Sequence, residues 1–358
     1  MVRNFESFLG ANTPLGFVSF FDELYNPYDN STAYIIKGGP GTGKSTLMKK
    51  VDRECQRRGL ATEKVYCSSD PDSLDGIIVP DLGVSICDGT SPHTLEPKFP
   101  GACENIINTG AFWDKAKLRE KADTIRSLTL ENSIHHRRSV KYLAAAGSIA
   151  EENIRMTSAY IDRDKTDGFA LRFSMRELSR KKNSPPGKRM KRFISALTPK
   201  GYVFLDGGIM SLASRIIAID DEYSCASSLL LDRIGETAIK NGYDVIFCHC
   251  PLQPRSMCEH IIIPEKNLAL ITVRSAHKTR IEADRIIHTK RFFREGINEH
   301  MAYLRFNRRL MRALTEEAVN ALKKAKSIHD ELEKIYAEAM DFTALNDYLD
   351  SLLKDIFS

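Results

Sequence analysis

The chain carries an internal repeat that relates its two halves. The segment Phe8–Val18 matches Phe193–Val203 without a gap, with a Thr-Pro pair and a glycine at the same spacing in both. Further matches keep the same order, with Ile77–Asp81 repeated as Ile261–Glu265, and the period is about 184 residues. A period of this length is far longer than the unit of a solenoid. The sequence therefore predicts two domains built on one plan.

A segment that cannot continue a helix separates the two halves. Asn183–Gly187 holds two prolines and a glycine. We therefore expect one domain over residues 1–185 and a second over residues 186–358. Basic residues flank this segment between positions 180 and 192, and we interpret them as a solvated charged hinge. The net charge of +5 is too weak to imply nucleic-acid binding by itself, so nucleic acid is not an expected partner.

Each half alternates apolar strand-like runs with helix-like stretches. The expected strands are 33–37, 64–67 and 83–87 in the first half and 215–219, 244–248 and 268–273 in the second. The expected helices are 44–58 and 227–241, and each half ends in a long charged helical stretch, at about 112–182 and 290–357. Strands that alternate with helices favour a parallel sheet. The predicted fold class is therefore α/β, with two tandem parallel-sheet domains that each carry a helical appendage.

Composition places the chain among globular proteins. Hydrophobic residues make up 42% and charged residues 28%, which excludes wholesale disorder. No apolar run approaches the length of a membrane-spanning helix, and residues 1–16 do not resemble a secretion signal. We therefore expect a cytoplasmic protein with no membrane partner, whose eight cysteines are reduced thiols.

The segment Gly38–Ser45 fits a phosphate-binding pattern at every position. Its sequence, Gly-Gly-Pro-Gly-Thr-Gly-Lys-Ser, matches G-x-x-x-x-G-K-[ST] and lies between an expected strand and an expected helix. Glycines let backbone N–H groups turn toward phosphate oxygens, and the N-terminus of the helix adds partial positive charge. Lys44 is expected to span the β- and γ-phosphates, Ser45 to ligate Mg²⁺, and Thr46 to lie near the α-phosphate. The expected nucleotide-binding residues are Gly38, Gly39, Pro40, Gly41, Thr42, Gly43, Lys44, Ser45 and Thr46.

On these residues the chain resembles the P-loop NTPase superfamily. A wider set of segments is similar to a bacterial family of tandem-duplicated P-loop ATP-binding proteins: Gly38–Lys50, Cys67–Asp75, Asp88–His93 and Pro97–Gly101. The resemblance covers nearly the whole chain. It implies ATP binding and a duplicated NTPase fold, and it implies no physiological substrate.

The second half departs from the phosphate-binding pattern. When Val51 is aligned with Ile234, the segment Asp221–Ser228 falls opposite the loop, and Ser227 stands where Lys44 stands. Every loop glycine is gone, and the acidic residues there would repel phosphate. The second copy is therefore expected to be degenerate, serving either as a structural lobe or in a regulatory or substrate role.

Carboxylates follow two of the expected strands in the first half. Asp88 ends an apolar strand, the position of a Walker B aspartate that holds Mg²⁺ or orients a water, and its counterpart in the second half is Thr272. Asp70 and Asp72 follow the second strand, where loops line the ligand crevice of a parallel sheet. Either is a candidate general base. The alternative is an ordinary turn, with Asp75 on a solvated face.

Histidine and arginine candidates complete the expected site. His93 is either a sensor of the γ-phosphate or a structural histidine. Arg274, Lys278 and Arg280 lie beside the repeat of this segment in the second half. If the halves pack about a pseudo-twofold axis, one of these cations would reach the first site as an arginine finger; the alternative is a surface strand end.

Three functions follow from these residues. The first is a Mg²⁺-dependent ATPase that couples hydrolysis to movement between two lobes, with Lys44, Asp88 and Asp70 as catalytic candidates and Ser45 and Asp88 as Mg²⁺ ligands. The second is a small-molecule or nucleotide kinase in which Asp70 or Asp72 is the general base. The third is a nucleotide-dependent binding module whose helical appendages contact a protein partner. The expected ligands are ATP and Mg²⁺, joined by an acceptor molecule or a protein partner.

Overall fold

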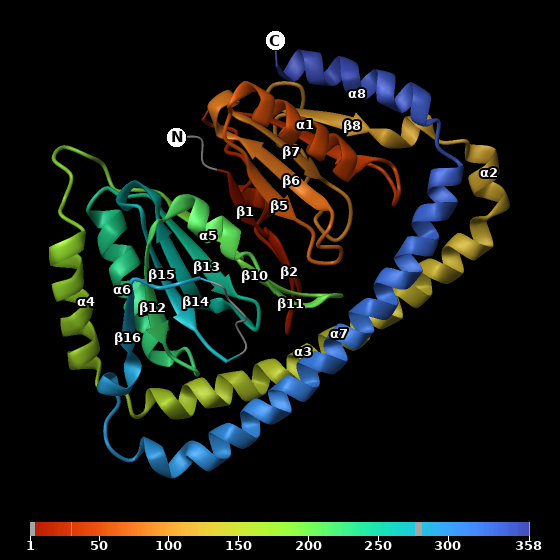
Figure 1. The fold of residues 1–358 in the computed structure, drawn as a ribbon. Helices are drawn as coiled ribbons and strands as arrows, with labels where there is room; N and C mark the ends of the chain where they lie inside the picture. Colours follow the sequence, from red (N-terminus) through yellow and green to blue (C-terminus); the bar gives the residue numbers. More distant parts are fainter. Residues whose placement is uncertain (1–3, 30, 276–280, 358) are drawn as a thin grey trace.

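The computed structural model describes residues 4–29, 31–275 and 281–357 and has two lobes, each built on a six-stranded sheet (Figure 1). The first sheet has the strand order β1 (Phe5–Ser7), β5 (Glu63–Tyr66), β6 (Leu74–Val79), β7 (Val84–Asp88), β4 (Thr32–Lys37) and β8 (Glu104–Asn108). The second has the order β9 (Arg189–Arg192), β13 (Val245–Cys250), β14 (Gln253–Ile263), β15 (Leu268–Val273), β12 (Arg215–Asp220) and β16 (Arg285–His288).

The two sheets have one topology. In each sheet the third strand in the order, β6 or β14, runs antiparallel to both of its neighbours, and all other neighbouring strands are parallel. A β-hairpin accompanies each sheet, formed by β2 (Gly10–Thr13) with β3 (Gly16–Ser19) and by β10 (Ser195–Thr198) with β11 (Gly201–Phe204). The repeat in the sequence is therefore a repeat of the fold, and the α/β class with two sheets is as predicted.

The prediction of purely parallel sheets was wrong for β6 and β14. Residues 67–73 join β5 to β6, and parallel neighbours need a crossover of a dozen or more residues. Two strands joined this closely form a hairpin, so β6 runs antiparallel to β5 and, on its other side, to β7. The sheets are therefore mixed.

The helices follow the predicted order. They are α1 (Lys44–Arg58), α2 (Lys115–Glu120), α3 (Ala122–Ser158), α4 (Arg163–Glu177), α5 (Asp206–Leu212), α6 (Cys225–Lys240), α7 (Met301–Glu338) and α8 (Phe342–Ile356). Short 3₁₀ helices are η1 (Phe21–Glu23), η2 (Pro80–Leu82), η3 (Thr109–Phe112), η4 (Pro264–Lys266), η5 (Thr289–Phe292) and η6 (Ile297–His300). The bounds of α1 coincide with the predicted stretch 44–58, because the glycine-rich loop ends where this helix begins and Gly59, with a φ of 71°, ends it.

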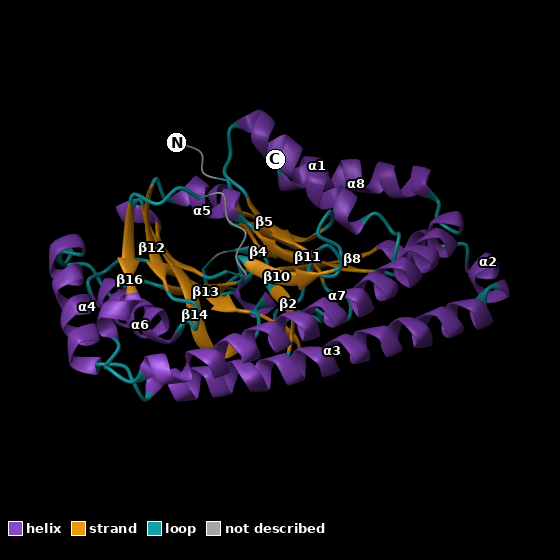
Figure 2. Cartoon of the chain, turned by 60° about the horizontal axis from the view of Figure 1, so that its bottom comes forward, coloured by secondary structure: helices purple, strands orange, loops and turns teal. Residues whose placement is uncertain are grey.

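The long helices α3 and α7 run side by side along one side of both lobes (Figures 1 and 2). At the far end of α3, α4 packs on α6 of the second lobe, where Phe173 joins the core around Leu230. At the far end of α7, α8 returns to the first lobe, where Leu345 and Leu349 join the core around Met48. Each half therefore contributes its last helix to the lobe formed by the other half. The domain division at residues 185 and 186 stays a prediction.

Basic residues of the predicted hinge make contacts inside the protein. Arg192 is buried, and its guanidinium donates to both carboxylate oxygens of Glu63, at 2.5 and 3.0 Å, across the two lobes. Arg189 pairs with Glu236, and Lys188 pairs with Asp29 at 3.3 Å. The interpretation as a solvated hinge was wrong for Arg192, because parallel pairing of β9 with β13 carries its side chain into the junction between the sheets.

In the part of the chain that the structure describes, no helix combines the length and the apolar character that crossing a membrane requires. All eight cysteines are among the described residues, and none of them forms a disulfide.

Candidate functional site

The loop between β4 and α1 has a backbone that only glycine accommodates readily. Gly41 and Gly43 have φ angles of 65° and 78°, in the left-handed region that other residues rarely adopt. At Gly38 the constraint is space, because a Cβ there would lie 1.9 Å from the hydroxyl oxygen of Thr109 in η3. That hydroxyl also donates to the hydroxyl of Thr42 at 3.1 Å. The backbone conformation at Gly41 and Gly43 and the lack of space at Gly38 therefore require glycine at these three positions.

Lys44 and Asp88 meet beside this loop. β4 and β7 are parallel neighbours in which Ile36 is in register with Asp88, so the Asp88 carboxylate lies at the edge where the loop begins. The Lys44 Nζ lies 3.3 Å from Oδ2 of Asp88 and donates to the carbonyl oxygens of Gly38 and Gly39 at 3.2 and 2.8 Å. Both charged side chains are 13% exposed. The structure therefore brings together two of the three predicted catalytic residues.

The two predicted Mg²⁺ ligands offer oxygen donors, the kind that this ion prefers. Oδ1 of Asp88 accepts hydrogen bonds from the N–H and hydroxyl of Thr90 at 2.9 and 2.5 Å, which orients its other oxygen toward Lys44. Ser45 follows Lys44 in the first turn of α1, and its Oγ accepts a hydrogen bond from the N–H of Leu74 at 3.0 Å. The donor set fits the ion. Of the remaining predicted nucleotide contacts, Pro40 is half-buried and Thr46 is exposed.

Asp70, the third predicted catalytic residue, contacts Ser73 and Lys326. Its Oδ2 accepts the hydroxyl of Ser73 at 2.9 Å and lies 3.5 Å from Nζ of Lys326 in α7. Asp72 binds Nζ of Lys200, from the second lobe, at 2.6 Å. Both aspartates therefore form a turn that contacts the other half of the chain, which is the alternative that the sequence left open.

Sequence reasoning missed a buried pair formed by Asp75 and His93. Oδ2 of Asp75, in β6, lies 3.2 Å from Nε2 of His93, and both side chains are almost fully buried. The ring of His93 packs against Phe17 and Phe21, with ring centroids 4.9 Å apart in each case. Burial, together with the nearby carboxylate of Asp88 and against the opposing effect of His93, raises the pKa of Asp75 to about 6. The alternative that placed Asp75 on a solvated face was wrong, because this residue belongs to a strand that the sequence analysis did not assign.

Helices of the second half lie directly against the loop formed by residues 38–45. A Cβ on Gly41 would be 2.6 Å from the backbone carbonyl oxygen of Glu333 in α7. A Cβ on Gly39 would be 3.1 Å from the ring of Tyr336, also in α7, and one on Gly43 would be 3.2 Å from Leu345 in α8. The loop therefore contacts the helix that leads back to the second lobe.

No protein-family model, curated protein or solved structure matches this chain. The chemistry of the site therefore rests on its geometry.

In the second lobe, a carboxyl group of the protein lies at the position that corresponds to the loop of the first lobe. Asp221 is buried, and its Oδ2 accepts a hydrogen bond from the backbone N–H of Ser227 at 2.8 Å, at the N-terminus of α6. Burial raises the pKa of Asp221, and hydrogen bonds from backbone N–H groups oppose that shift. Ser224 precedes α6 in a left-handed conformation, as Gly43 precedes α1 in the first lobe. When the two copies are aligned on these residues, Cys225 stands opposite Lys44. Neither Cys225 nor Ser227, which the sequence alignment places opposite Lys44, is a cation, so the second lobe has no equivalent of Lys44.

Arg274, one of the three arginine-finger candidates, is engaged within the second lobe. Arg274 follows β15, forms an ion pair with the buried Glu259 and lines a cavity in the second lobe. Lys278 and Arg280 lie outside the described residues.

Proposed function

We propose that the chain binds ATP through the loop 38–45 and hydrolyses it in a Mg²⁺-dependent reaction. The observation that carries this proposal is the contact between Lys44 and Asp88 beside a loop with two left-handed glycines. A cation at the start of α1 and a carboxylate at the end of the adjacent strand β7 are the two charges that binding of a magnesium nucleotide requires. The backbone N–H groups of the loop and the N-terminus of α1 add favourable interactions with phosphate.

The residues present assign roles within this proposal. Lys44 would exchange the carbonyl oxygens of Gly38 and Gly39 for phosphate oxygens. Ser45 and Asp88 would hold Mg²⁺, which when bound neutralises charge on the phosphate oxygens. Asp75 lies close enough to Asp88 for the two charges to interact, so the Asp75–His93 pair acts as a positioning pair that tunes the charge of the site.

Contacts with α7 support coupling between nucleotide binding and the arrangement of the lobes. Glu333 and Tyr336 touch the loop from one end of α7, and the same helix continues to the second lobe. A nucleotide that enlarges or reshapes the loop would displace these contacts. No observation favours the kinase alternative, because Asp70 and Asp72 are engaged by Lys326 and Lys200.

A nucleotide-dependent binding module is the second candidate, and the helix contacts with the loop favour it. In that case the chain would bind ATP and turn it over negligibly. Measuring binding and turnover on the same preparation separates the two candidates.

The test combines calorimetry with a phosphate-release assay. We expect titration of Mg²⁺–ATP to release heat, and radiolabelled γ-phosphate to appear as free phosphate. Lys44→Ala removes the cation of the loop and is expected to lower turnover by a factor of about 100 or more. Arg53→Ala, an exposed change on the same helix, is the matched control and is expected to behave as wild type. No heat from ATP or GTP, or unchanged turnover in Lys44→Ala, would overturn the proposal. Label transferred to an acceptor would favour the kinase.

A further inference from the structure

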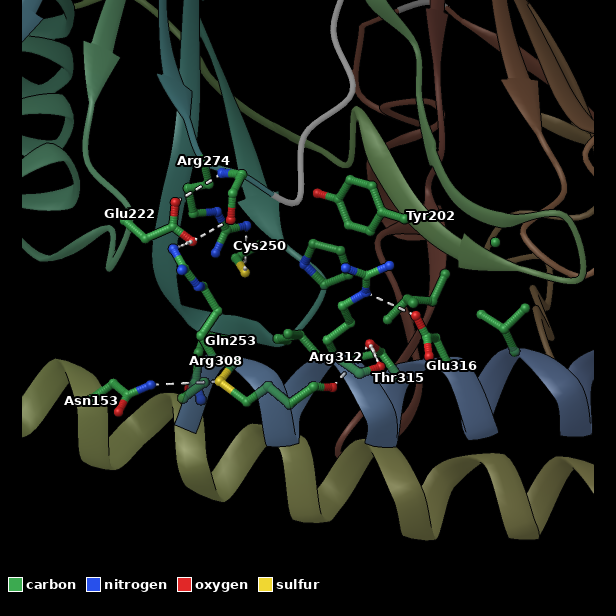
Figure 3. Close-up of a pocket in the computed structure, with 18 of the residues that line it drawn as sticks. Asn153, Tyr202, Glu222, Cys250, Gln253, Arg274, Arg308, Arg312, Thr315 and Glu316 are labelled. Carbon is green, nitrogen blue, oxygen red and sulfur yellow. Dashed lines mark hydrogen bonds and ion pairs between the residues drawn. The ribbon is translucent and has the colours of Figure 1, made fainter. Parts of the chain in front are cut away.

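A cavity of about 690 Å³ lies in the second lobe, at the edge of the sheet where β12, β13 and β15 end (Figure 3). Glu222 follows β12, Cys250 ends β13, and Arg274 follows β15, and all three line the cavity. In open α/β sheets, ligands bind outside the carboxyl ends of the strands. The volume lies in the usual range for small-molecule sites. The cavity therefore occupies the edge that corresponds to the nucleotide loop of the first lobe.

Basic side chains outnumber acidic ones around the cavity. The basic lining residues are Arg274, Arg308, Arg309, Arg312 and Lys323, and the acidic ones are Glu222 and Glu316. Figure 3 shows Arg308 and Arg312 extending from α7 into the cavity, Arg308 toward Glu222 and Arg312 below Tyr202. The two lining carboxylates and the buried Glu259, which pairs with Arg274, offset three of these five charges. The cavity keeps a positive balance and therefore favours an anion.

The ion-pair partners of the individual cations support this charge balance. Arg308 lies 3.6 Å from a carboxylate oxygen of Glu222, and Arg312 donates to Glu316 at 2.9 Å. Within residues 4–29, 31–275 and 281–357, Arg309 and Lys323 have no ion-pair partner. The cavity thus holds cations that no described carboxylate neutralises.

Apolar side chains form the rest of the wall. They come from α3, the hairpin of the second lobe, β14 and α7, and they are Ala150, Ile154, Leu197, Met257, Met311 and Val319. The ring of Tyr202 also faces the cavity (Figure 3). A cavity lined by both cationic and apolar side chains fits a ligand with an anionic head and an apolar body.

We propose that this cavity is a binding site for a phosphate monoester that carries an apolar organic group. Arginines reach it from the end of β15 and from α7, and guanidinium groups match phosphate oxygens in a bidentate geometry. The phosphate would not bind at the N-terminus of α6, because the Asp221 carboxylate already accepts from the N–H of Ser227 there. The second copy has thus exchanged a backbone phosphate site for one made of arginine side chains. This inference does not depend on the proposed function of the first lobe.

The test uses 1-naphthyl phosphate as a fluorescent probe and follows its anisotropy as protein is added to a fixed probe concentration. We expect saturable binding of 1-naphthyl phosphate, and much weaker binding of 1-naphthol and of inorganic phosphate. The double variant Arg308→Gln/Arg312→Gln should weaken probe binding by about tenfold or more, because it removes two charge-assisted contacts. Arg305→Gln removes the same charge from an exposed position of α7 outside the cavity lining and should leave the affinity unchanged.

Several outcomes would overturn the proposal. Binding that is lost in Lys44→Ala would place the probe at the loop of the first lobe. Equal affinity for 1-naphthol would remove the role of the anion, and tighter binding of 1-naphthoate would remove the assignment to phosphate. Lys44→Ala removes the proposed ATP contact and does not change the cavity lining. Probe binding in that variant therefore tests the cavity independently of ATP binding.

Discussion

The backbones of Phe8 and Phe193 form a reciprocal pair of hydrogen bonds, with N–O distances of 2.8 and 2.9 Å. These two residues occupy the same position in the two copies of the repeat. Asn12 continues the pattern, because its side-chain amide donates to the carbonyl of its own counterpart, Leu197, at 3.0 Å. Contacts between equivalent residues are the mark of a twofold relationship, so the two copies pack about a pseudo-twofold axis that passes between these phenylalanines.

Loss of either phenylalanine ring is expected to destabilise the whole protein. Both side chains are fully buried in one apolar cluster at this axis. Phe8→Ala and Phe193→Ala should each lower the free energy of unfolding by about 3–5 kcal/mol, as large-to-small changes in cores do. Because the two rings share a cluster, the loss of stability in the double variant should differ from the sum of the two single losses. Urea denaturation measures these changes, with the exposed Tyr28→Ala as the control. A change below about 1 kcal/mol in both single variants would contradict this packing.

Asp88→Asn separates binding from turnover. The substitution keeps the shape of the side chain and its contact with Thr90, but it removes the charge that faces Lys44. We expect the rate of ATP turnover to fall much more than the affinity for ATP, since the carboxylate is assigned to the metal and the attacking water. Calorimetry and phosphate release give the two quantities. Equal losses of both would indicate that Asp88 has a structural role.

Asp75 is expected to make stability depend on pH. Its pKa in the folded protein is about 6, above the usual value near 3.8, so the folded state holds a proton that the unfolded state releases between these pH values. The free energy of unfolding therefore falls as pH rises from 4 to 6, by about 3 kcal/mol for this group, and the cost remains at higher pH. Asp75→Asn cannot titrate, so its stability relative to wild type should rise by that amount between pH 4 and pH 7.

Denaturant titrations at pH 4 and pH 7 test this prediction. Asp72→Asn is the control: hydrogen bonding and ion pairing with Lys200 lower the pKa of Asp72 below its usual value near 3.8, so its stability relative to wild type should change little between pH 4 and pH 7. An Asp75→Asn variant with the same relative stability at both pH values would show that folding does not raise the pKa of Asp75.

The local parts of this structure could be predicted from the sequence. The bounds of α1 and the position of Asp88 at a strand end depend on residues close in the chain, where glycine geometry and apolar runs give direct signals. The antiparallel β6 was missed because Asp75 and Gly76 interrupt the apolar pattern of that strand. Burial of Asp75 then depends on His93, a residue from another loop, which no local pattern reveals.

For a related reason, the sequence could not show that α4 packs on the second lobe and α8 on the first. The amphipathic pattern of α8 shows that one face is buried, but it carries no signal for the lobe that buries it. Only the tertiary structure places Leu345 of α8 against the loop at Gly43. The contact between α7 and the same loop has the same origin, and it leads to a further prediction.

Gly41→Ala is expected to disturb both the loop and the end of α7. The new Cβ would lie 2.6 Å from the carbonyl oxygen of Glu333, and the φ of 65° disfavours any side chain. Gly59→Ala is a matched control, because Gly59 has a φ of 71° and a Cβ at that position would meet no atom within 4 Å. Gly59→Ala should cost only the backbone strain, about 1–2 kcal/mol, whereas Gly41→Ala should cost more. Gly41→Ala should also speed amide hydrogen exchange near Glu333. Equal stability losses and unchanged exchange in the two variants would show that α7 does not press on the loop.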